Sequence, residues 1–137
     1  MPVVDASVVV DWVSPDADPR GPARRRLARW ALDGARLFAP RLLAEEVSNA
    51  LLTGCRRGRW SGSAADVAYQ LLRQMPVSQA DTATDLDRAW ELSRRYDEHP
   101  VYDMVYVALA ERLGEQLVTA DERLRARLVG FDFVVAP

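Results

Sequence analysis

Short apolar segments alternate with longer helix-like segments along the whole chain. Segments with the composition of buried strands lie at residues 3–6, 36–39, 75–77, 116–119 and 132–135. Helical spacing of apolar residues predicts helices at residues 7–13, 23–32, 41–56, 61–74, 83–96, 102–113 and 121–128. This alternation favours an α/β domain with a mainly parallel sheet, in which ligands bind at the carboxyl ends of the strands.

Four carboxylates lie beside segments that are expected to be buried. They are Asp5 after the first strand, Glu46 within a long helix, Asp103 at the start of a helix that is apolar nearly all round, and Asp121 after a later strand. A carboxylate beside core residues loses hydration, and four close together would repel one another unless a divalent cation neutralised them. The four acids therefore predict a metal site made of oxygen ligands.

Each acid also has a purely structural interpretation. Asp5 can cap a turn, and Ser7 can bind its carboxylate or a metal-bound water. Glu46 faces apolar neighbours on its helix and can bond to Asn49. Asp103 complements the dipole of its helix. Asp121 can cap the helix that follows it, and capping is compatible with metal binding because the two can use different oxygens.

Length and composition narrow the possibilities further. The 137 residues suit a single domain spanning 1–137, and no apolar run is long enough for a transmembrane helix. The N-terminus lacks the basic region of a signal peptide, so a cytoplasmic protein is expected. One cysteine and one histidine exclude an internal disulfide and make a structural zinc site implausible. All eighteen basic residues are arginine, which excludes mechanisms that need a lysine.

Other polar and aromatic residues rank below the four acids. His99 precedes a proline and is expected at the surface, and Cys55 is expected to be a small core residue. Asp11 can serve as a further outer acid, but a solvated helix end is favoured. The tryptophans are expected to be core or interface anchors, except that Trp60 follows an arginine-rich helix end and is expected to be exposed to a partner.

Four segments in order resemble the PIN-domain family, and specifically the VapC-like toxin ribonucleases of type II toxin–antitoxin systems. The segments are Val4-Asp5-Ala6-Ser7, Glu46-Val47-Ser48-Asn49-Ala50-Leu51 after Ala39-Pro40, Tyr102-Asp103 through Glu111, and Leu117-Val118-Thr119-Ala120-Asp121. Four such segments at family-like separations, covering nearly the whole chain, are fairly specific.

The resemblance implies a three-layer α/β/α sandwich and an RNA-cleaving enzyme. It implies Mg²⁺ or Mn²⁺ held by Asp5, Glu46, Asp103 and Asp121, with Ser7, Asn49 and Thr119 as supporting polar groups. It also implies an RNA substrate, an antitoxin protein that blocks the site, and a homodimer. The proline-rich, acidic loop at residues 14–22 departs from the family pattern, which leaves the substrate-entry side open.

The acidic pocket itself repels RNA, so arginines at its rim must bind the flanking phosphates. Three clusters are available, at Arg24-Arg25-Arg26, Arg56-Arg57-Arg59 and Arg123-Arg125-Arg127. Two other classes stay open. One is a Mg²⁺-dependent phosphotransfer or phosphatase domain, which normally uses a lysine that this chain lacks. The other is a catalytically silent PIN-like module that binds RNA or protein without turnover.

Overall fold

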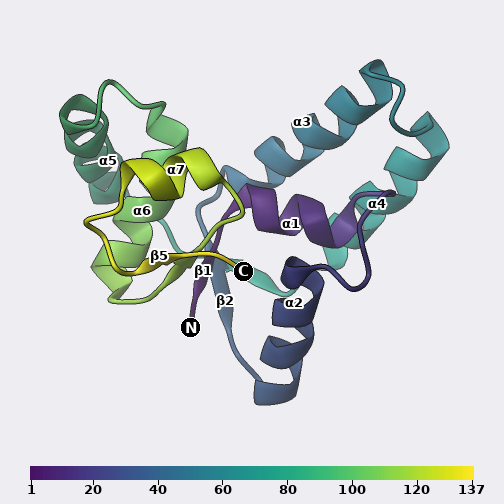
Figure 1. The fold of residues 1–137 in the computed structure, drawn as a ribbon, viewed down its shortest axis with the longest axis horizontal. Coiled ribbons are helices and arrows are strands. Elements are labelled where there is room, and N and C mark those ends of the chain that lie inside the picture. The colour runs from purple at the N-terminus through teal and green to yellow at the C-terminus, as the bar shows by residue number, and fades with distance from the viewer.

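The computed structural model describes all 137 residues and contains five strands and seven helices (Figure 1). The elements follow the chain in the order β1 (Val3–Val4), α1 (Ala6–Val13), α2 (Pro22–Asp33), β2 (Leu37–Ala39), α3 (Leu43–Arg56), α4 (Gly62–Gln74), β3 (Val77–Gln79), α5 (Ala83–Arg95), α6 (Val101–Leu113), β4 (Leu117–Val118), α7 (Glu122–Arg127) and β5 (Val134–Val135). The predicted alternation of strands and helices is confirmed.

The five strands form one parallel sheet in the order β3-β2-β1-β4-β5. Val3 pairs with Phe38 on one side and with Leu117 on the other. Strands β2 and β3 therefore lie on one side of β1, and β4 and β5 lie on its other side. This reversal makes the carboxyl ends of β1 and β4 neighbours, which is where parallel α/β sheets bind ligands.

Helices cover both faces of the sheet, as a three-layer α/β/α sandwich requires. Figure 1 shows α1 to α4 on one side and α5 to α7 on the other. Helix α6 is the most deeply placed, because all seven residues from Met104 to Ala110 are buried. This burial explains its lack of a polar face, and the predicted fold class is confirmed.

Most element boundaries differ from the sequence-based expectation by one or two residues, and two of these differences have a clear local cause. Helix α2 begins at Pro22 rather than at residue 23, since proline is favoured at the first helical position, where no N–H donor is needed. Strand β3 begins at Val77 rather than at residue 75, because Met75 is the C-cap of α4 and Val77 is the first residue to pair with β2.

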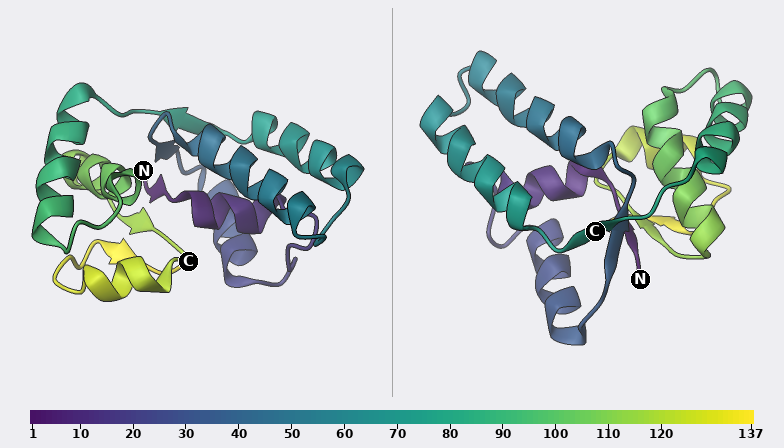
Figure 2. Two further views of the ribbon diagram at one scale, coloured as in Figure 1. Left: turned by 90° about the horizontal axis from the view of Figure 1, so that it is seen from above. Right: turned by 180° about the vertical axis from the view of Figure 1, so that it is seen from behind.

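Helices α3 and α4 form an antiparallel pair that projects beyond the sheet (Figure 2). The exposed Trp60 expected at their junction is a wrong prediction. The Trp60 indole donates a hydrogen bond to the Leu51 carbonyl over 2.9 Å, and its ring lies where a side chain on Gly54 would be. None of the helices has the length and apolar character needed to span a bilayer.

Candidate metal centre

Asp5 sits at the junction of β1 and α1 and is 95% buried. Its Oδ2 accepts hydrogen bonds from the Ser7 hydroxyl at 2.5 Å and the Thr119 hydroxyl at 2.9 Å, and it also caps α1 through the Ser7 N–H. Burial raises the pKa of Asp5, and the two hydroxyls oppose that effect. All these bonds use Oδ2, so Oδ1 remains available to another ligand.

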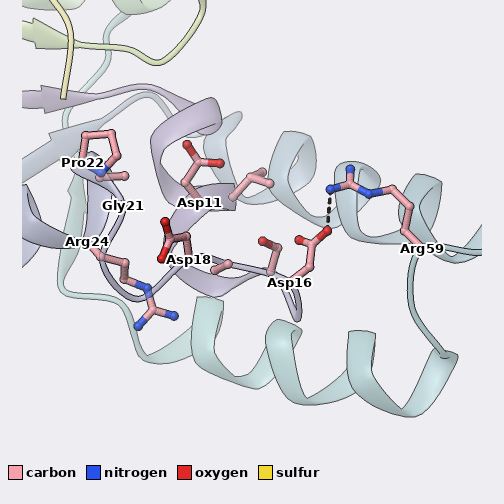
Figure 3. Close-up of a pocket in the computed structure, with 11 residues that line it drawn as sticks. Asp11, Asp16, Asp18, Gly21, Pro22, Arg24 and Arg59 are labelled. Carbon is pink, nitrogen blue, oxygen red and sulfur yellow. Dashed lines mark hydrogen bonds and ion pairs between the residues drawn. The ribbon is translucent and has the colours of Figure 1, made fainter.

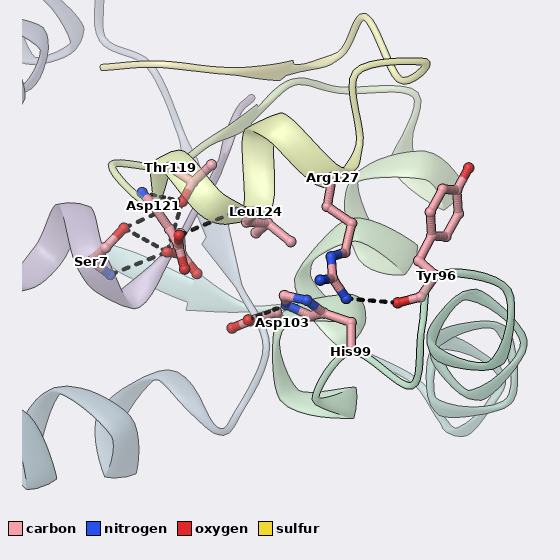
Figure 4. A network of polar contacts seen from close by, with 9 residues as sticks. Ser7, Tyr96, His99, Asp103, Thr119, Asp121, Leu124 and Arg127 are labelled. Atoms are coloured by element: carbon pink, nitrogen blue, oxygen red, sulfur yellow. Dashed lines mark hydrogen bonds and ion pairs between the residues drawn. The ribbon is translucent and has the colours of Figure 1, made fainter.

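Ser7 and Thr119 connect the carboxyl ends of β1 and β4. The Ala120 N–H donates to the Ser7 hydroxyl, and the Asp121 N–H donates to the Thr119 hydroxyl, each over 3.0 Å. Asp121 then caps α7, because its Oδ1 accepts from the Leu124 N–H at 3.1 Å. One network of hydrogen bonds therefore links Asp5 to Asp121. Figure 4 shows Ser7, Thr119 and Asp121 of this network.

Glu46 approaches this edge from α3, and Tyr106 approaches it from α6. Glu46 Oε1 and the Tyr106 hydroxyl are both buried, and neither makes a hydrogen bond of good geometry. The pKa of Glu46 is raised to about 7, mainly by burial and also by the charges of Asp5 and Asp103, while the Tyr106 hydroxyl opposes this rise. Tyr106 was missed in the sequence because it reads as one more apolar position of a buried helix.

Asp103 lies in the first turn of α6, with its side chain 26% exposed. His99 Nε2 is 2.6 Å from Asp103 Oδ2, and the His99 side chain is only 11% exposed. The expectation of a surface histidine was wrong. The signal that could have found this contact is the spacing of four residues between His99 and Asp103.

The structure brings the four acids to one edge of the sheet by two routes. The charge of Asp103 acts on Asp5, the charges of Asp5 and Asp103 both act on Glu46, and Asp121 joins through Thr119. They do not form a ready-made coordination shell, because no three histidine, cysteine or acidic side chains are grouped tightly enough to hold an ion. The assignment of these residues as metal ligands stays a prediction.

The residues present nevertheless fit a hard divalent cation. Glu46 Oε1 is a buried oxygen with no partner, and Asp5 leaves one oxygen unused. The group offers only oxygen donors, which are the ligands that Mg²⁺ and Mn²⁺ prefer. A cation here would offset the desolvation and mutual repulsion that raise the pKa values of Asp5 and Glu46.

Two other predicted residues lie apart from this group. Asn49 is exposed, lines a shallow groove between α3 and α4, and makes no hydrogen bond to Glu46, so its supporting role gains no structural basis. Asp11 borders a separate hollow of about 350 Å³ beside the loop at residues 14–22, where Arg59 pairs with Asp16 at 2.7 Å (Figure 3). That hollow contains none of the four acids, and Asp11 is exposed, as its solvated interpretation requires.

Fold and site together define a parallel α/β domain that gathers carboxylates at the carboxyl edge of its sheet. Residues 3–127 match the family model described as PIN domain. Ribonuclease VapC3 of Mycobacterium tuberculosis is 40% identical over 122 residues, which cover 89% of this chain and 83% of that protein. The chain therefore belongs to the PIN-domain family, among its VapC-like members.

Solved structures share the same fold at lower sequence identity. PAE2754 from Pyrobaculum aerophilum matches with a TM-score of 0.69 and 22% identity over 98% of this chain and 87% of that one. VapC20 of Mycobacterium tuberculosis, described as a sarcin-ricin loop cleaving toxin, matches with a TM-score of 0.68 and 22% identity over 98% of both chains. At these identities the likeness concerns the fold alone.

Proposed function

We propose that this protein is a metal-dependent endoribonuclease that acts as the toxin of a toxin–antitoxin pair. The observation that carries the proposal is the buried, unpartnered Oε1 of Glu46, which feels the charges of Asp5 and Asp103, in a chain that belongs with the VapC ribonucleases. Metal-assisted hydrolysis needs such an oxygen-rich site, and it needs neither a lysine nor a nucleophilic side chain.

The roles of the chain's own residues follow from their contacts. Asp5, Glu46, Asp103 and Asp121 would hold one or two Mg²⁺ or Mn²⁺ ions, and Ser7 and Thr119 orient Asp5. When bound, the ion supplies positive charge for the scissile phosphate and activates a water for in-line attack. Asp121 serves this site while it caps α7, since the two tasks use different oxygens.

Arginines on α7 are the best placed to receive RNA near the site. The helix begins directly after Asp121 and carries Arg123, Arg125 and Arg127. Arg125 is committed to the Thr119 carbonyl, whereas Arg123 is exposed to solvent. We infer that α7 contributes phosphate contacts that offset the repulsion between RNA and the acids.

The VapC-like relationship also leads us to expect partners. We propose an antitoxin protein that covers the acidic edge, a homodimer as the free toxin, and a single PIN-like domain acting in the cytoplasm. Sedimentation equilibrium of the purified chain would give the dimer mass if this expectation holds and the monomer mass if it does not.

The activity itself is tested with purified protein and labelled single-stranded RNA. We expect cleavage with Mg²⁺ or Mn²⁺ and none in excess chelator. Asp103→Asn should cut about 1000-fold more slowly or worse, because loss of metal-assisted stabilisation amounts to several kcal/mol. This variant should keep the native fold, or gain stability, since a repulsive charge is removed.

Three outcomes of that assay would overturn the proposal. Full RNA cleavage in excess chelator would show that the reaction does not need a metal ion. RNA binding without cleavage would indicate a silent module. Hydrolysis of small phosphate esters without RNA cleavage would indicate a phosphatase. Asp103→Asn also controls for contaminating nucleases, because their activity would persist in that preparation.

A further inference from the structure

The contact between His99 and Asp103 has a definite donor and acceptor. A carboxylate only accepts hydrogen bonds, so the 2.6 Å contact requires a hydrogen on His99 Nε2 that is donated to Asp103 Oδ2. This fixes one oxygen of Asp103 and leaves Oδ1 as the one free to bind a cation. Figure 4 shows the imidazole directed at the Asp103 carboxylate.

His99 owes its position to an unusual turn between α5 and α6. Asp97 and Glu98 adopt φ values of 57° and 52°, and both are left-handed conformations that residues other than glycine seldom adopt. Two such residues in succession persist only where their surroundings hold them, and they are concentrated at functional sites. The surrounding structure must therefore hold this turn in its conformation.

Contacts from two sides hold that turn. The Tyr96 carbonyl accepts the His99 N–H at 3.1 Å and the Arg127 guanidinium at 3.0 Å, and Glu98 pairs with Arg94 at 2.7 Å. Arg127 belongs to α7, whose N-cap is Asp121. The turn that carries His99 is thus tied to an element that carries another of the four acids.

Pro100 separates His99 from the helix that carries Asp103. Proline disfavours helical backbone in the residue before it, and Pro100 is the N-cap of α6. His99 therefore lies outside the helix, and its side chain reaches across the first turn to Asp103. Pro100 therefore sets the backbone conformation from which the His99 side chain contacts Asp103.

We propose that His99 is a positioning residue of the metal centre, which orients Asp103 through Oδ2 so that Oδ1 can bind a divalent cation. This rests on the proposed function of the same site. Hydrogen bonds from outside a metal's ligand set orient the ligands, and their loss typically weakens metal binding by about 10–100-fold. His99 is not itself a ligand in this scheme.

The test measures Mn²⁺ binding to the full chain by calorimetry, without RNA. His99→Ala should weaken binding by about 10–100-fold. His99→Gln keeps a side-chain N–H donor and should recover most of the affinity. Arg127→Ala should give a smaller loss, because it removes only one of the contacts that hold the turn. Circular dichroism and melting temperature identify any variant that fails to fold.

RNA cleavage by the same variants separates metal binding from turnover. His99→Ala should need more Mn²⁺ for half-maximal activity and should approach the wild-type kcat once the site is saturated. Unchanged Mn²⁺ affinity in a folded His99→Ala protein would overturn the proposal. Imidazole nitrogen coupled directly to Mn²⁺ in electron spin-echo spectra would overturn it too, by making His99 a ligand.

Asp103→Asn distinguishes this failure from failure of the metal site. If Asp103→Asn loses Mn²⁺ while His99→Ala keeps it, only the role of His99 is wrong. If Asp103→Asn binds Mn²⁺ as tightly as the wild type, the proposed metal centre is wrong and the role of His99 falls with it.

Discussion

The surroundings of Glu46 oppose its negative charge. Its pKa is raised from 4.5 to about 7, so between these pH values the folded protein binds more protons than the unfolded chain. The metal-free protein should therefore lose stability as pH rises from about 4.5 through about 7. A bound cation would offset this loss of stability, because it favours the ionised form of Glu46.

Glu46→Gln removes this dependence. In chelator above pH 7 we expect the variant to be more stable than the wild type by roughly 1–2 kcal/mol, after allowing for partial exposure of the side chain. Below pH 4.5 the two should be equal. Urea unfolding across this range measures the difference, and the exposed neighbour Glu45→Gln serves as control. A constant difference at every pH would contradict the argument.

Residue-scale predictions from the sequence succeeded where a single local environment decides. Ser7 lies two residues after Asp5, so the hydrogen bond between them could be anticipated. The four-residue spacing between His99 and Asp103 is a signal of their contact, but the burial of His99 depends on two left-handed residues that no composition rule predicts. The role of Tyr106 could not be predicted, because its hydroxyl acts on Glu46 only when the fold brings α3 and α6 together.

At the scale of elements, Asp85 joins α5 to α6. Its carboxylate accepts two hydrogen bonds from Arg112, at 2.8 and 3.0 Å, and one from the Thr82 N–H at 2.9 Å. Burial alone would raise the pKa of Asp85, but the bonds from Arg112 and Thr82 outweigh it, so the pKa falls below its ordinary 3.8. The ion pair therefore stabilises the fold above that pH and loses its effect as pH falls.

Asp85→Asn should lower the free energy of unfolding at pH 7 by about 2–3 kcal/mol. This is less than a fully buried ion pair would lose, because Arg112 is partly exposed. The difference from wild type should shrink as the solution is acidified below about pH 4. Denaturant unfolding at several pH values tests this, with the exposed Asp87→Asn as control. Equal effects of the two variants would contradict the role of Asp85.

The junction of α3 and α4 depends on Gly54. A Cβ atom there would lie 2.0 Å from the Trp60 ring, so Gly54→Ala should destabilise the protein by about 1–3 kcal/mol. Gly62→Ala, at the open start of α4, should be neutral or slightly stabilising. Thermal unfolding of both variants makes the comparison, and a neutral Gly54→Ala would show that the ring moves away freely.

Element types and order could be predicted because strand and helix periodicities differ and because Pro and Gly mark most boundaries. Which face of each helix packs into the core was harder to predict. Trp12 and Trp30 pack edge to face in the core, as expected, whereas Trp90 is 64% exposed and the adjacent Ala89 is buried. Close packing of α5 on α6 favours the small residue, which an apolar scale ranks below tryptophan.

At the scale of the whole molecule, the sheet order decides which residues meet. β1 and β4 are neighbours although more than a hundred residues separate Asp5 from Thr119, and Glu46 and Asp103 arrive from helices on opposite faces. The sequence alone could suggest the four acids but not how closely their oxygens approach. That depends on side-chain rotation, which a bound ion would itself bias.

The central claim is that these four acids share a divalent cation. Crystals of the protein soaked with Mn²⁺ would locate the ion by its anomalous scattering. We expect a Mn²⁺ peak whose ligands include oxygens of Asp5, Glu46, Asp103 and Asp121, at about the 2.0–2.2 Å typical of hard divalent ions. A peak elsewhere, or none at this edge at saturating Mn²⁺, would contradict the account.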